Sequence, residues 1–493
     1  MTADSSPPPS PEGARPVAPL IGLVAGPTLC LALAVLPAPD GLGQEAWLTA
    51  GVAVWMALWW LTQAVPLAVT ALLPVLLFPV LGIAKAADAA QAYAHPLVFL
   101  FLGGFVIALT IERWNLHRRV AIAIVSVAGV RPDRLIGGFM LATAGLSMWV
   151  SNTATTLMMV PIGLSVVAFI EGRRQDGEPP TPAQDRFARG LLLAIAYAAS
   201  IGGTATLIGT PPNAFLAGYL AQNHGVDLGF ARWMLLGVPL AAVMLLAAWL
   251  LLTRVLYRAE GLDLTRVAAG IAAEKARLAP PTRGEALTAL LFAAVALAWV
   301  FQPLIADVVP VSDTAIALTG AVAAFAIPVN LKKREFLMDW DHAIHLPWGI
   351  LILLGGGFSL AEAIQSTGLA AWLGGLVAGG SHLPLVLLLL AITGLVVFLT
   401  EITSNTATAA VFIPVAATLA VSLGFDAVTF AVPVALAASC AFMMPVATPP
   451  NAIVFAAGRL DVMHMCAAGI FLNLIATAMI TGAALILVPM VFG

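Results

Sequence analysis

Long apolar runs, separated by short polar segments, follow one another along almost the whole chain. A helix needs about 20 apolar residues to cross the hydrocarbon core of a membrane. Eleven runs approach or exceed that length. We therefore predict an all-α polytopic membrane protein with about eleven spanning helices, at residues 18–36, 46–62, 66–82, 96–114, 189–220, 232–254, 284–302, 311–329, 348–372, 427–458 and 466–492.

Two further apolar runs, 133–169 and 383–421, have a different pattern. Each is long enough for two short helices, and each carries a polar cluster at its middle. We predict that both are re-entrant hairpins, which return to the side of the membrane from which they came. Non-helical backbone at membrane depth is tolerated only where it is buried in protein or lines a polar cavity. The two hairpin tips are therefore candidate functional sites.

The composition supports a membrane protein and excludes several other classes. Only 10% of the 493 residues are charged and 61% are hydrophobic, whereas soluble domains carry about 25% charged residues. A soluble enzyme, a disordered chain and a nucleic-acid-binding protein are excluded on this ground. The cysteines Cys30, Cys440 and Cys466 lie far apart and show neither metal-ligand nor disulfide spacing.

The positions of the basic residues predict the orientation. If the two hairpins do not cross, all Lys and Arg residues except Lys85 and Arg232 fall on one side of the membrane. Basic residues accumulate on the cytoplasmic side, so we expect a cytoplasmic N-terminus and an external C-terminus. One miscounted crossing in the middle of the chain would destroy this segregation, which therefore also supports the hairpins.

The sequence contains an internal repeat. Ser151–Thr155 has the sequence Ser-Asn-Thr-Ala-Thr, which recurs 253 residues later at Ser404–Thr408. The pair Gly103-Gly104 recurs as Gly356-Gly357 at the same offset. Five predicted crossings separate the two Ser-Asn-Thr segments, and an odd number inverts the second copy relative to the first. Inverted repeats with interrupted helices are typical of secondary transporters, whose binding sites lie near the bilayer midplane.

A second repeated motif interrupts two of the predicted spans. Thr-Pro-Pro-Asn occurs at Thr210–Asn213 and again at Thr448–Asn451. Proline breaks a helix within a span, whereas Thr followed by Pro is suited to begin one. We predict half-helices at 189–208 and 211–220 with a joint at Gly209-Thr210, and a second joint at Ala447-Thr448.

The repeated residues are suited to holding a cation and an anion side by side. Carbonyl groups freed at a tip can bind a hard cation such as Na⁺, and the amides that begin the next helix can face an anion. Neither tip nor joint contains Lys, Arg or His. A bound anion would therefore need a co-bound cation to offset its charge, although a neutral polar substrate would suit the same residues.

Several charged residues lie near these motifs. Glu401 is either a proton or cation site or a hydrogen-bonding support for the second tip, and we favour the support. The spacing of His342 and His345 predicts a helix at the cytoplasmic interface. Glu112 and Arg113, with Arg118 and Arg119 close by, are interpreted as an interfacial charge cluster.

These motifs resemble those of the divalent anion:sodium symporter family, over roughly residues 18–493. The resemblance implies that substrate is held by Ser151, Asn152, Thr153, Thr210, Pro211, Ser404, Asn405, Thr406, Thr448 and Pro449. It implies one sodium site at Ser147, Ser151, Asn152 and Gly209, and another at Thr400, Ser404, Asn405 and Ala447. It also implies a homodimer in which a scaffold domain supports a transport domain that moves as an elevator.

The predicted organisation follows from the repeat. We expect a disordered tail (1–17), scaffold helices of the first repeat (18–132), a first part of the transport domain (133–256) and a cytoplasmic linker (257–283). Scaffold helices of the second repeat (284–381) and a second part of the transport domain (382–493) complete the chain.

The sequence thus predicts a secondary active transporter of the cytoplasmic (inner) membrane. It would import a C4-dicarboxylate such as succinate, malate or fumarate together with Na⁺. A sodium-independent dicarboxylate exchanger and a sulfate or citrate carrier of the same fold stay open as alternatives. A membrane-embedded enzyme is disfavoured because no catalytic constellation occurs at membrane depth, and a channel because half-helices that close on one site suit alternating access.

Overall fold

The structure is a computed structural model that describes residues 17–129, 131–171, 180–259, 262, 275–276, 278–306, 309–377 and 383–493. Residues 1–16 of the predicted tail and most of the predicted linker lie outside the described residues. The described chain is almost entirely helical, as expected.

The first repeat begins with helices that we predicted to form scaffold. They are α1 (Val17–Val35), α2 (Gln44–Thr62), α3 (Leu67–Thr70), α4 (Leu73–Leu81), α5 (Ala86–Gln91), the 3-10 turn η1 (Ala92–Ala94), α6 (Pro96–Arg113) and α7 (Leu116–Val127). The predicted transport part follows as α8 (Pro132–Ser147), α9 (Asn152–Glu171), α10 (Pro182–Gly203), α11 (Pro211–His224), α12 (Phe230–Leu250) and the π-helical η2 (Leu251–Leu256).

The helices from residue 283 onward lie in the part that we predicted to be the second repeat. Its first group comprises α14 (Arg283–Val300), α15 (Gln302–Ala306), α16 (Asp313–Ala326), the two-stranded antiparallel sheet β1 (Pro328–Asn330) and β2 (Glu335–Phe336), α17 (Trp340–Ala343), α18 (Trp348–Ser366) and α19 (Leu369–Val377). Its second group comprises α20 (Leu385–Leu399), α21 (Asn405–Ser422), α22 (Ala427–Ala438), α23 (Pro449–Ala456) and α24 (Val462–Phe492).

Eight helical segments of the described chain are long and apolar enough to cross a membrane. The predicted span at 66–82 is a shorter apolar helical segment, Leu67–Leu81, with a turn at Ala71-Leu72 between α3 and α4. Pro74 lacks the backbone N–H that would bond to the Thr70 carbonyl in a continuous helix, which explains the turn. The predicted interfacial helix around His342 is reduced to the single turn of α17, in which Asp339 caps His342. Helix α7 and the small sheet were not expected.

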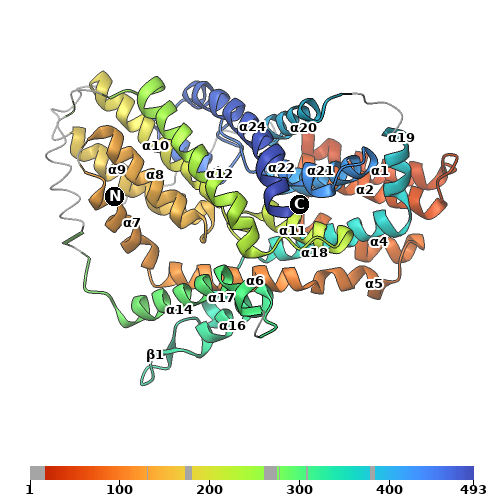
Figure 1. Ribbon diagram of the computed structural model, residues 1–493, viewed down its shortest axis with the longest axis horizontal. Coiled ribbons are helices and arrows are strands. Elements are labelled where there is room, and N and C mark those ends of the chain that lie inside the picture. The colour runs from red at the N-terminus through yellow and green to blue at the C-terminus, as the bar shows by residue number, and fades with distance from the viewer. Residues whose placement is uncertain are drawn as a thin grey trace, which may run out of the picture.

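The two predicted hairpins appear as helix pairs with a short non-helical tip. Helices α8 and α9 meet at Met148–Ser151, and α20 and α21 meet at Thr400–Ser404. Helices α9 and α21 are themselves long enough to cross a membrane, so the re-entrant path stays a prediction. In Figure 1 the group of α8, α9 and α10 lies at the left, the group of α20, α21 and α22 lies at the upper right, and α6 runs beneath both.

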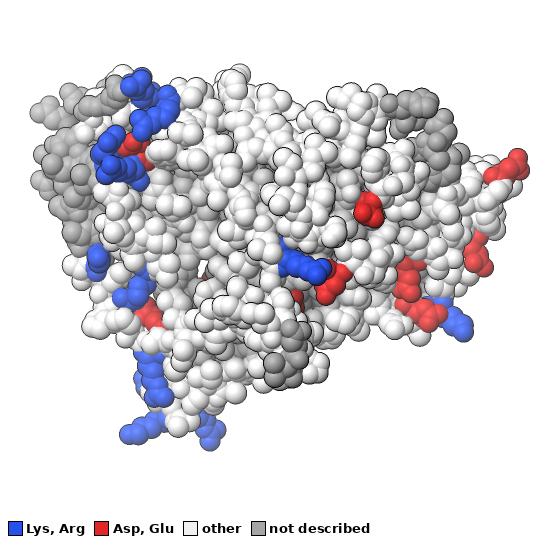
Figure 2. All heavy atoms as spheres, viewed as in Figure 1, with Lys and Arg blue, Asp and Glu red and all other residues white. Residues whose placement is uncertain are grey.

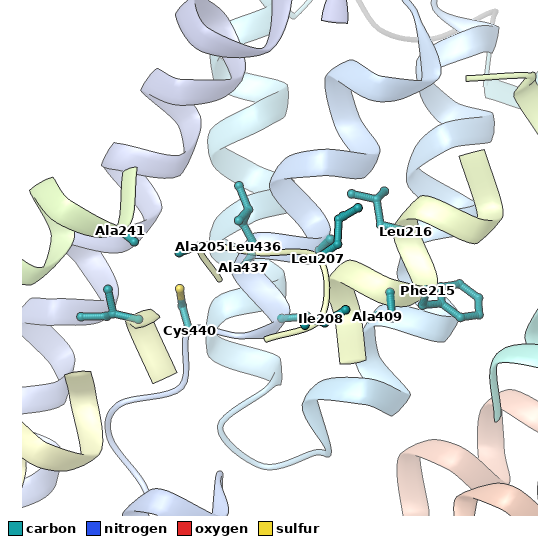
Figure 3. Packing of buried hydrophobic residues seen from close by; sticks show 14 of the residues in the cluster. Ala205, Leu207, Ile208, Phe215, Leu216, Ala241, Ala409, Leu436, Ala437 and Cys440 are labelled. Carbon is teal, nitrogen blue, oxygen red and sulfur yellow. The ribbon is translucent and has the colours of Figure 1, made fainter. Parts of the chain in front are cut away.

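The two repeats interlock at the centre of the molecule. Helix α11 packs on α21 and α22, while α23 packs on α9 and α10. Figure 3 shows this contact, in which the side chains are small or aliphatic and buried, among them Ala205, Leu207, Leu216, Ala409, Leu436 and Ala437. This apolar contact fixes the two interrupted helices against each other and brings their joints close together.

The repeated glycine pairs permit close approaches between helices. A Cβ on Gly103 would lie 2.6 Å from the backbone of Ala317 in α16, and one on Gly356 would lie 2.1 Å from the carbonyl oxygen of Ala71. The second glycine of the first pair, Gly104, faces Ile208 of the first joint. A side chain at either first position would force these backbones apart, so glycine is required there.

Candidate functional site

The two tips and the two joints surround one cavity of about 740 Å³. All ten residues that the sequence predicted to hold substrate line this cavity: Ser151, Asn152, Thr153, Thr210, Pro211, Ser404, Asn405, Thr406, Thr448 and Pro449. They come from segments that are up to 298 residues apart in the sequence (Ser151 to Pro449). The fold therefore brings the repeated motifs to one place.

At the first tip, three oxygen atoms converge behind the cavity wall. The Ser147 hydroxyl lies 2.6 Å from Oδ1 of Asn152 and 2.8 Å from the carbonyl oxygen of Ala199, near the end of α10. Ser147 is fully buried and does not line the cavity. The hydroxyl of Ser151 accepts a hydrogen bond from the amide of Ala154 at 3.2 Å and so caps the start of α9.

The second tip reproduces this arrangement with a threonine. The Thr400 hydroxyl lies 2.9 Å from Oδ1 of Asn405 and 2.9 Å from the carbonyl oxygen of Ala438, the last residue of α22. Thr400 is also fully buried. Both tips thus join a hydroxyl, the asparagine of the Ser-Asn-Thr motif and a carbonyl near the end of a half-helix.

The first joint is longer than the sequence predicted. Helix α10 ends at Gly203 instead of residue 208, and α11 begins at Pro211. Nδ2 of Asn213 donates to the carbonyl oxygens of Thr206 (2.8 Å) and Thr204 (3.2 Å). A side-chain amide therefore replaces the helical hydrogen bonds that the unwound carbonyls have lost.

The second joint extends over Ser439–Thr448, again longer than the predicted Ala447-Thr448. Nδ2 of Asn451 donates to the carbonyl oxygens of Met444 (3.0 Å) and Ala441 (3.2 Å). The Thr448 hydroxyl accepts from the Asn451 amide at 3.3 Å, which confirms the predicted cap. Thr210 occupies the predicted N-cap position of α11, but its side chain makes no such bond.

Glu401 has the supporting role that we favoured. Its carboxylate is 3% exposed and accepts hydrogen bonds from the amides of Phe442 (2.7 Å), Met443 (2.9 Å) and Met444 (2.9 Å). The side chain of Asn473 in α24 adds a fourth donor at 2.8 Å. These four donors hold the unwound backbone of the second joint against the second tip.

Four apolar residues that the sequence analysis did not assign also line the cavity. Trp149 and Ile402 each lie two residues before the serine of a Ser-Asn-Thr motif. Ile208 and Val446 each lie two residues before the threonine of a Thr-Pro-Pro-Asn motif. Because both repeats place large apolar residues at matched positions, the repeat itself was a signal that could have revealed them.

The opposite wall of the cavity comes from helices outside the tips and joints. It includes Gln63 after α2, Phe105 and Glu112 of α6, and His345 and Pro347 before α18. Glu112 and His345 were interpreted from the sequence as interfacial residues, and the structure adds them to the cavity. No sequence motif connects them with the tips, so their place in the wall depends on tertiary packing.

The basic residue next to Glu112, Arg113, forms its ion pair with another carboxylate. Nη2 of Arg113 lies 2.6 Å from Oδ2 of Asp339, in the segment between β2 and α17. Burial opposes ionisation of Asp339, but hydrogen bonds from His342 and the charge of Arg113 outweigh it and lower the pKa of this carboxyl below its usual value. Arg113 is therefore paired with Asp339 rather than with Glu112.

The cavity wall is nearly free of charge. Among the described residues that line it there is no Lys or Arg, and in the described chain no three His, Cys, Asp and Glu side chains are grouped as a metal site. A cation at the tips would accordingly be held by hydroxyl, amide and carbonyl oxygens, which are ligands for a hard ion.

Comparison with known proteins indicates the family of the chain. A family profile for the sodium:sulfate symporter transmembrane region matches residues 18–492. Sodium-dependent dicarboxylate transporters named SdcS are similar over most of the chain. The one from Staphylococcus saprophyticus is 39% identical over 482 residues, covering 96% of this chain and 92% of that protein. One from Staphylococcus aureus is 39% identical over 479 residues, with the same coverage.

Two solved transporter structures have a similar fold. The YdaH transporter of Alcanivorax borkumensis matches with a TM-score of 0.56 at 15% identity, covering 95% of this chain and 96% of that one. MtrF of Neisseria gonorrhoeae, from a class of antimetabolite efflux pumps, matches with a TM-score of 0.56 at 13% identity and 95% coverage of both chains. With the profile match over nearly the whole sequence, these findings show that the chain belongs to the sodium:sulfate symporter family, the divalent anion:sodium symporters that its motifs resemble.

Proposed function

We propose that this protein is a secondary active transporter that imports small dicarboxylates, such as succinate, malate or fumarate, together with Na⁺. The observation that carries the proposal is the pair of matched oxygen clusters, Ser147–Asn152–Ala199 and Thr400–Asn405–Ala438, behind one cavity. The names of the relatives, which are sodium-dependent dicarboxylate transporters, favour this substrate and this ion over the alternatives.

The oxygen clusters are suited to Na⁺ because each contains more hydrogen-bond acceptors than its single hydroxyl proton can satisfy. A hydroxyl carries one proton, yet the Ser147 hydroxyl lies within hydrogen-bond distance of two acceptors, and so does that of Thr400. One acceptor in each cluster is left for a cation. At the first tip, Gly203 keeps this space open, since a Cβ there would lie 2.6 Å from Oδ1 of Asn152.

We place the two sodium sites at the residues that the family resemblance implied. The first comprises Ser147, Ser151, Asn152 and Gly209, and the second comprises Thr400, Ser404, Asn405 and Ala447. Six of these eight residues line the cavity, and the buried hydroxyls of Ser147 and Thr400 lie behind it.

The substrate carboxylates would face helix N-termini. Helices α9, α11, α21 and α23 begin at Asn152, Pro211, Asn405 and Pro449, and all four residues line the cavity. Helix N-termini attract anions through the helix dipole. At α9 and α21 free backbone amides add to this attraction, whereas α11 and α23 each begin with two prolines, which have no backbone N–H. The apolar residues Trp149, Ile208, Ile402 and Val446 would contact the carbon chain between the two carboxylates.

The orientation that we propose is consistent with the distribution of charge. Ion pairs between segments join residues that the charge distribution assigns to one side: Arg113–Asp339, Arg119–Glu285, Arg254–Asp133 and Arg459–Glu171. Figure 2 shows Lys and Arg along the left and lower-left edge of the face in view. We propose that this edge faces the cytoplasm, with the C-terminus outside and the protein in the inner membrane.

The movement that we propose is an elevator motion of the tips and joints past the remaining helices. Residues 133–256 and 382–493 would form the transport domain, and residues 18–132 and 284–381 the scaffold of a homodimer. Gln63, Glu112 and His345, which we assign to the cytoplasmic ends of scaffold segments, line the cavity. We therefore infer that the structure represents the inward-facing state.

Uptake of labelled succinate into proteoliposomes tests the proposal. We expect uptake that follows an inward Na⁺ gradient, is lost when choline replaces Na⁺, and needs no dicarboxylate inside the vesicles. Uptake that ignores Na⁺ but requires internal dicarboxylate would instead identify an exchanger. Uptake of labelled sulfate or citrate in place of labelled succinate would identify the other carriers.

A further inference from the structure

One acidic side chain lines a cavity that we propose for a dianion. Glu112 lies at the penultimate position of α6, and it is the only Asp or Glu among the described residues that form the cavity wall. No Lys or Arg of the described wall offsets its charge. A site built to attract a dianion would not be expected to carry an uncompensated charge of the same sign.

Contacts within the described part of the chain do not neutralise this carboxylate. Among the described residues, no hydrogen bond or ion pair reaches the side chain of Glu112, and its basic neighbour Arg113 is held by Asp339 at 2.6 Å. The Glu112 backbone carbonyl accepts a hydrogen bond from the amide of Asn115 at 3.0 Å. The side chain is half-buried, so solvent screens its charge only in part.

The position of Glu112 makes its effect depend on conformation. Helix α6 packs on α16 and α14, which we assign to the scaffold, whereas the Ser-Asn-Thr tips belong to the proposed transport domain. When the transport domain moves outward, the tips leave Glu112 behind. The carboxylate therefore repels bound substrate only while the cavity has the arrangement seen here.

We propose that Glu112 is a positioning residue that weakens dianion binding on the cytoplasmic side and so promotes substrate release into the cell. This inference rests on the proposed function, and in particular on the inward-facing assignment. Glu112 acts by electrostatic repulsion across the cavity, and it neither binds substrate nor holds Na⁺. The external affinity for substrate is independent of it.

Succinate transport in membrane vesicles of both orientations tests this inference. Replacing Glu112 by Gln preserves size and removes the charge, so we expect the KM for cytoplasmic succinate to fall several-fold while the external KM is unchanged. Glu112→Asp retains the charge and is the matched control, with a cytoplasmic KM close to that of the wild type. A higher cytoplasmic KM in E112Q would overturn the inference. Such a rise is expected if Glu112 is a cation ligand or supports the structure, since losing either role would weaken substrate binding. Equal changes on both sides would also overturn it.

A second measurement needs no variant. In the wild-type protein, the ratio of cytoplasmic to external inhibition constants should be larger for succinate, with two charges, than for its monomethyl ester, with one. Equal ratios would contradict an electrostatic role for Glu112. If wild-type vesicles transport no succinate from either side, the proposed function itself is rejected. That outcome is distinct from a rise in the cytoplasmic KM of E112Q, which rejects only the role of Glu112.

Discussion

The two halves of the cavity reach the same geometry by different means. Ser147 and Thr400 occupy equivalent positions, and each hydroxyl lies between the Oδ1 of the motif asparagine and a carbonyl near the end of a half-helix. Asn213 and Asn451 each span an unwound joint. The tip and the asparagine of the joint are therefore common to both halves.

The halves differ in what holds the joint in place. In the first, neutral donors do so: the Thr206 hydroxyl donates to the carbonyl oxygen of Met148 (2.5 Å), and Nε1 of the buried Trp233 donates to that of Thr204 (3.1 Å). In the second, the Glu401 carboxylate accepts three backbone amides and the Asn473 side chain. Position 148, which corresponds to Glu401, is a methionine.

This difference has an electrostatic consequence for the proposed sodium sites. Glu401 follows Thr400 directly, so a full negative charge lies beside the second oxygen cluster and none of the described residues provides one beside the first. Opposite charges attract strongly where water is excluded. We expect the second site to bind Na⁺ more tightly than the first, although the oxygen ligands of the two are alike.

The largest expected effect concerns the feature that the halves share. Asn152→Ala and Asn405→Ala each remove an oxygen that both the cation and the substrate would need, so each should reduce succinate uptake to background while the protein stays folded. Uptake into proteoliposomes and the thermal unfolding midpoint measure the two properties. Asn330→Ala, at the end of β1, is the matched control and should transport normally. Near-normal uptake by either site variant would refute the site assignment.

The next largest effect should differ between the two halves of the cavity. In Glu401→Gln, an amide group with its own N–H donors faces three backbone amides, and we expect a loss of about 3 kcal/mol in the free energy of unfolding. The apparent Na⁺ affinity should fall as well. The equivalent change Met148→Leu conserves volume and should cost less than about 1.5 kcal/mol. Denaturation with and without Na⁺ gives both quantities, and similar losses in the two variants would mean that Glu401 does not distinguish the joints.

Sequence patterns predicted the parts of this site that are encoded locally. Two copies of Ser-Asn-Thr and of Thr-Pro-Pro-Asn, at the centres of apolar runs, located both tips and both joints, and all ten predicted substrate residues line the cavity. Proline and the polar cluster act on the backbone within a few residues, so their effect is visible in the sequence.

The parts that were missed depend on contacts between distant segments. The joints are longer than predicted because Asn213 and Asn451 satisfy carbonyls that a helix would otherwise retain. The support of Glu401 by Asn473 joins residues 72 positions apart. Glu112 and His345 lie in the cavity wall because α6 and the segment before α18 pack beside the tips. The hydrophobic periodicity and the motif spacing of the sequence do not reveal such contacts.

A smaller effect should appear in the two hydroxyl groups behind the tips. Ser147→Ala and Thr400→Val each remove one oxygen from a cluster with little change in shape, so uptake should survive at high Na⁺ with a lower apparent Na⁺ affinity. Because Glu401 still supplies charge beside the second cluster, the loss should be greater for Ser147→Ala. Uptake measured against Na⁺ concentration provides the comparison, and a greater loss in Thr400→Val would contradict the electrostatic difference between the sites.

The smallest expected difference concerns the caps of the second half-helices. The Thr448 hydroxyl accepts from the Asn451 amide at 3.3 Å, whereas Thr210 makes no side-chain cap bond to α11. Loss of such a cap costs about 1 kcal/mol, so Thr448→Ala should lower the unfolding midpoint measurably and Thr210→Ala should lower it less. Both residues line the cavity, and changes in uptake therefore cannot separate them, whereas unfolding without substrate or Na⁺ isolates the cap. Equal shifts would show that the two half-helices begin in the same way in solution.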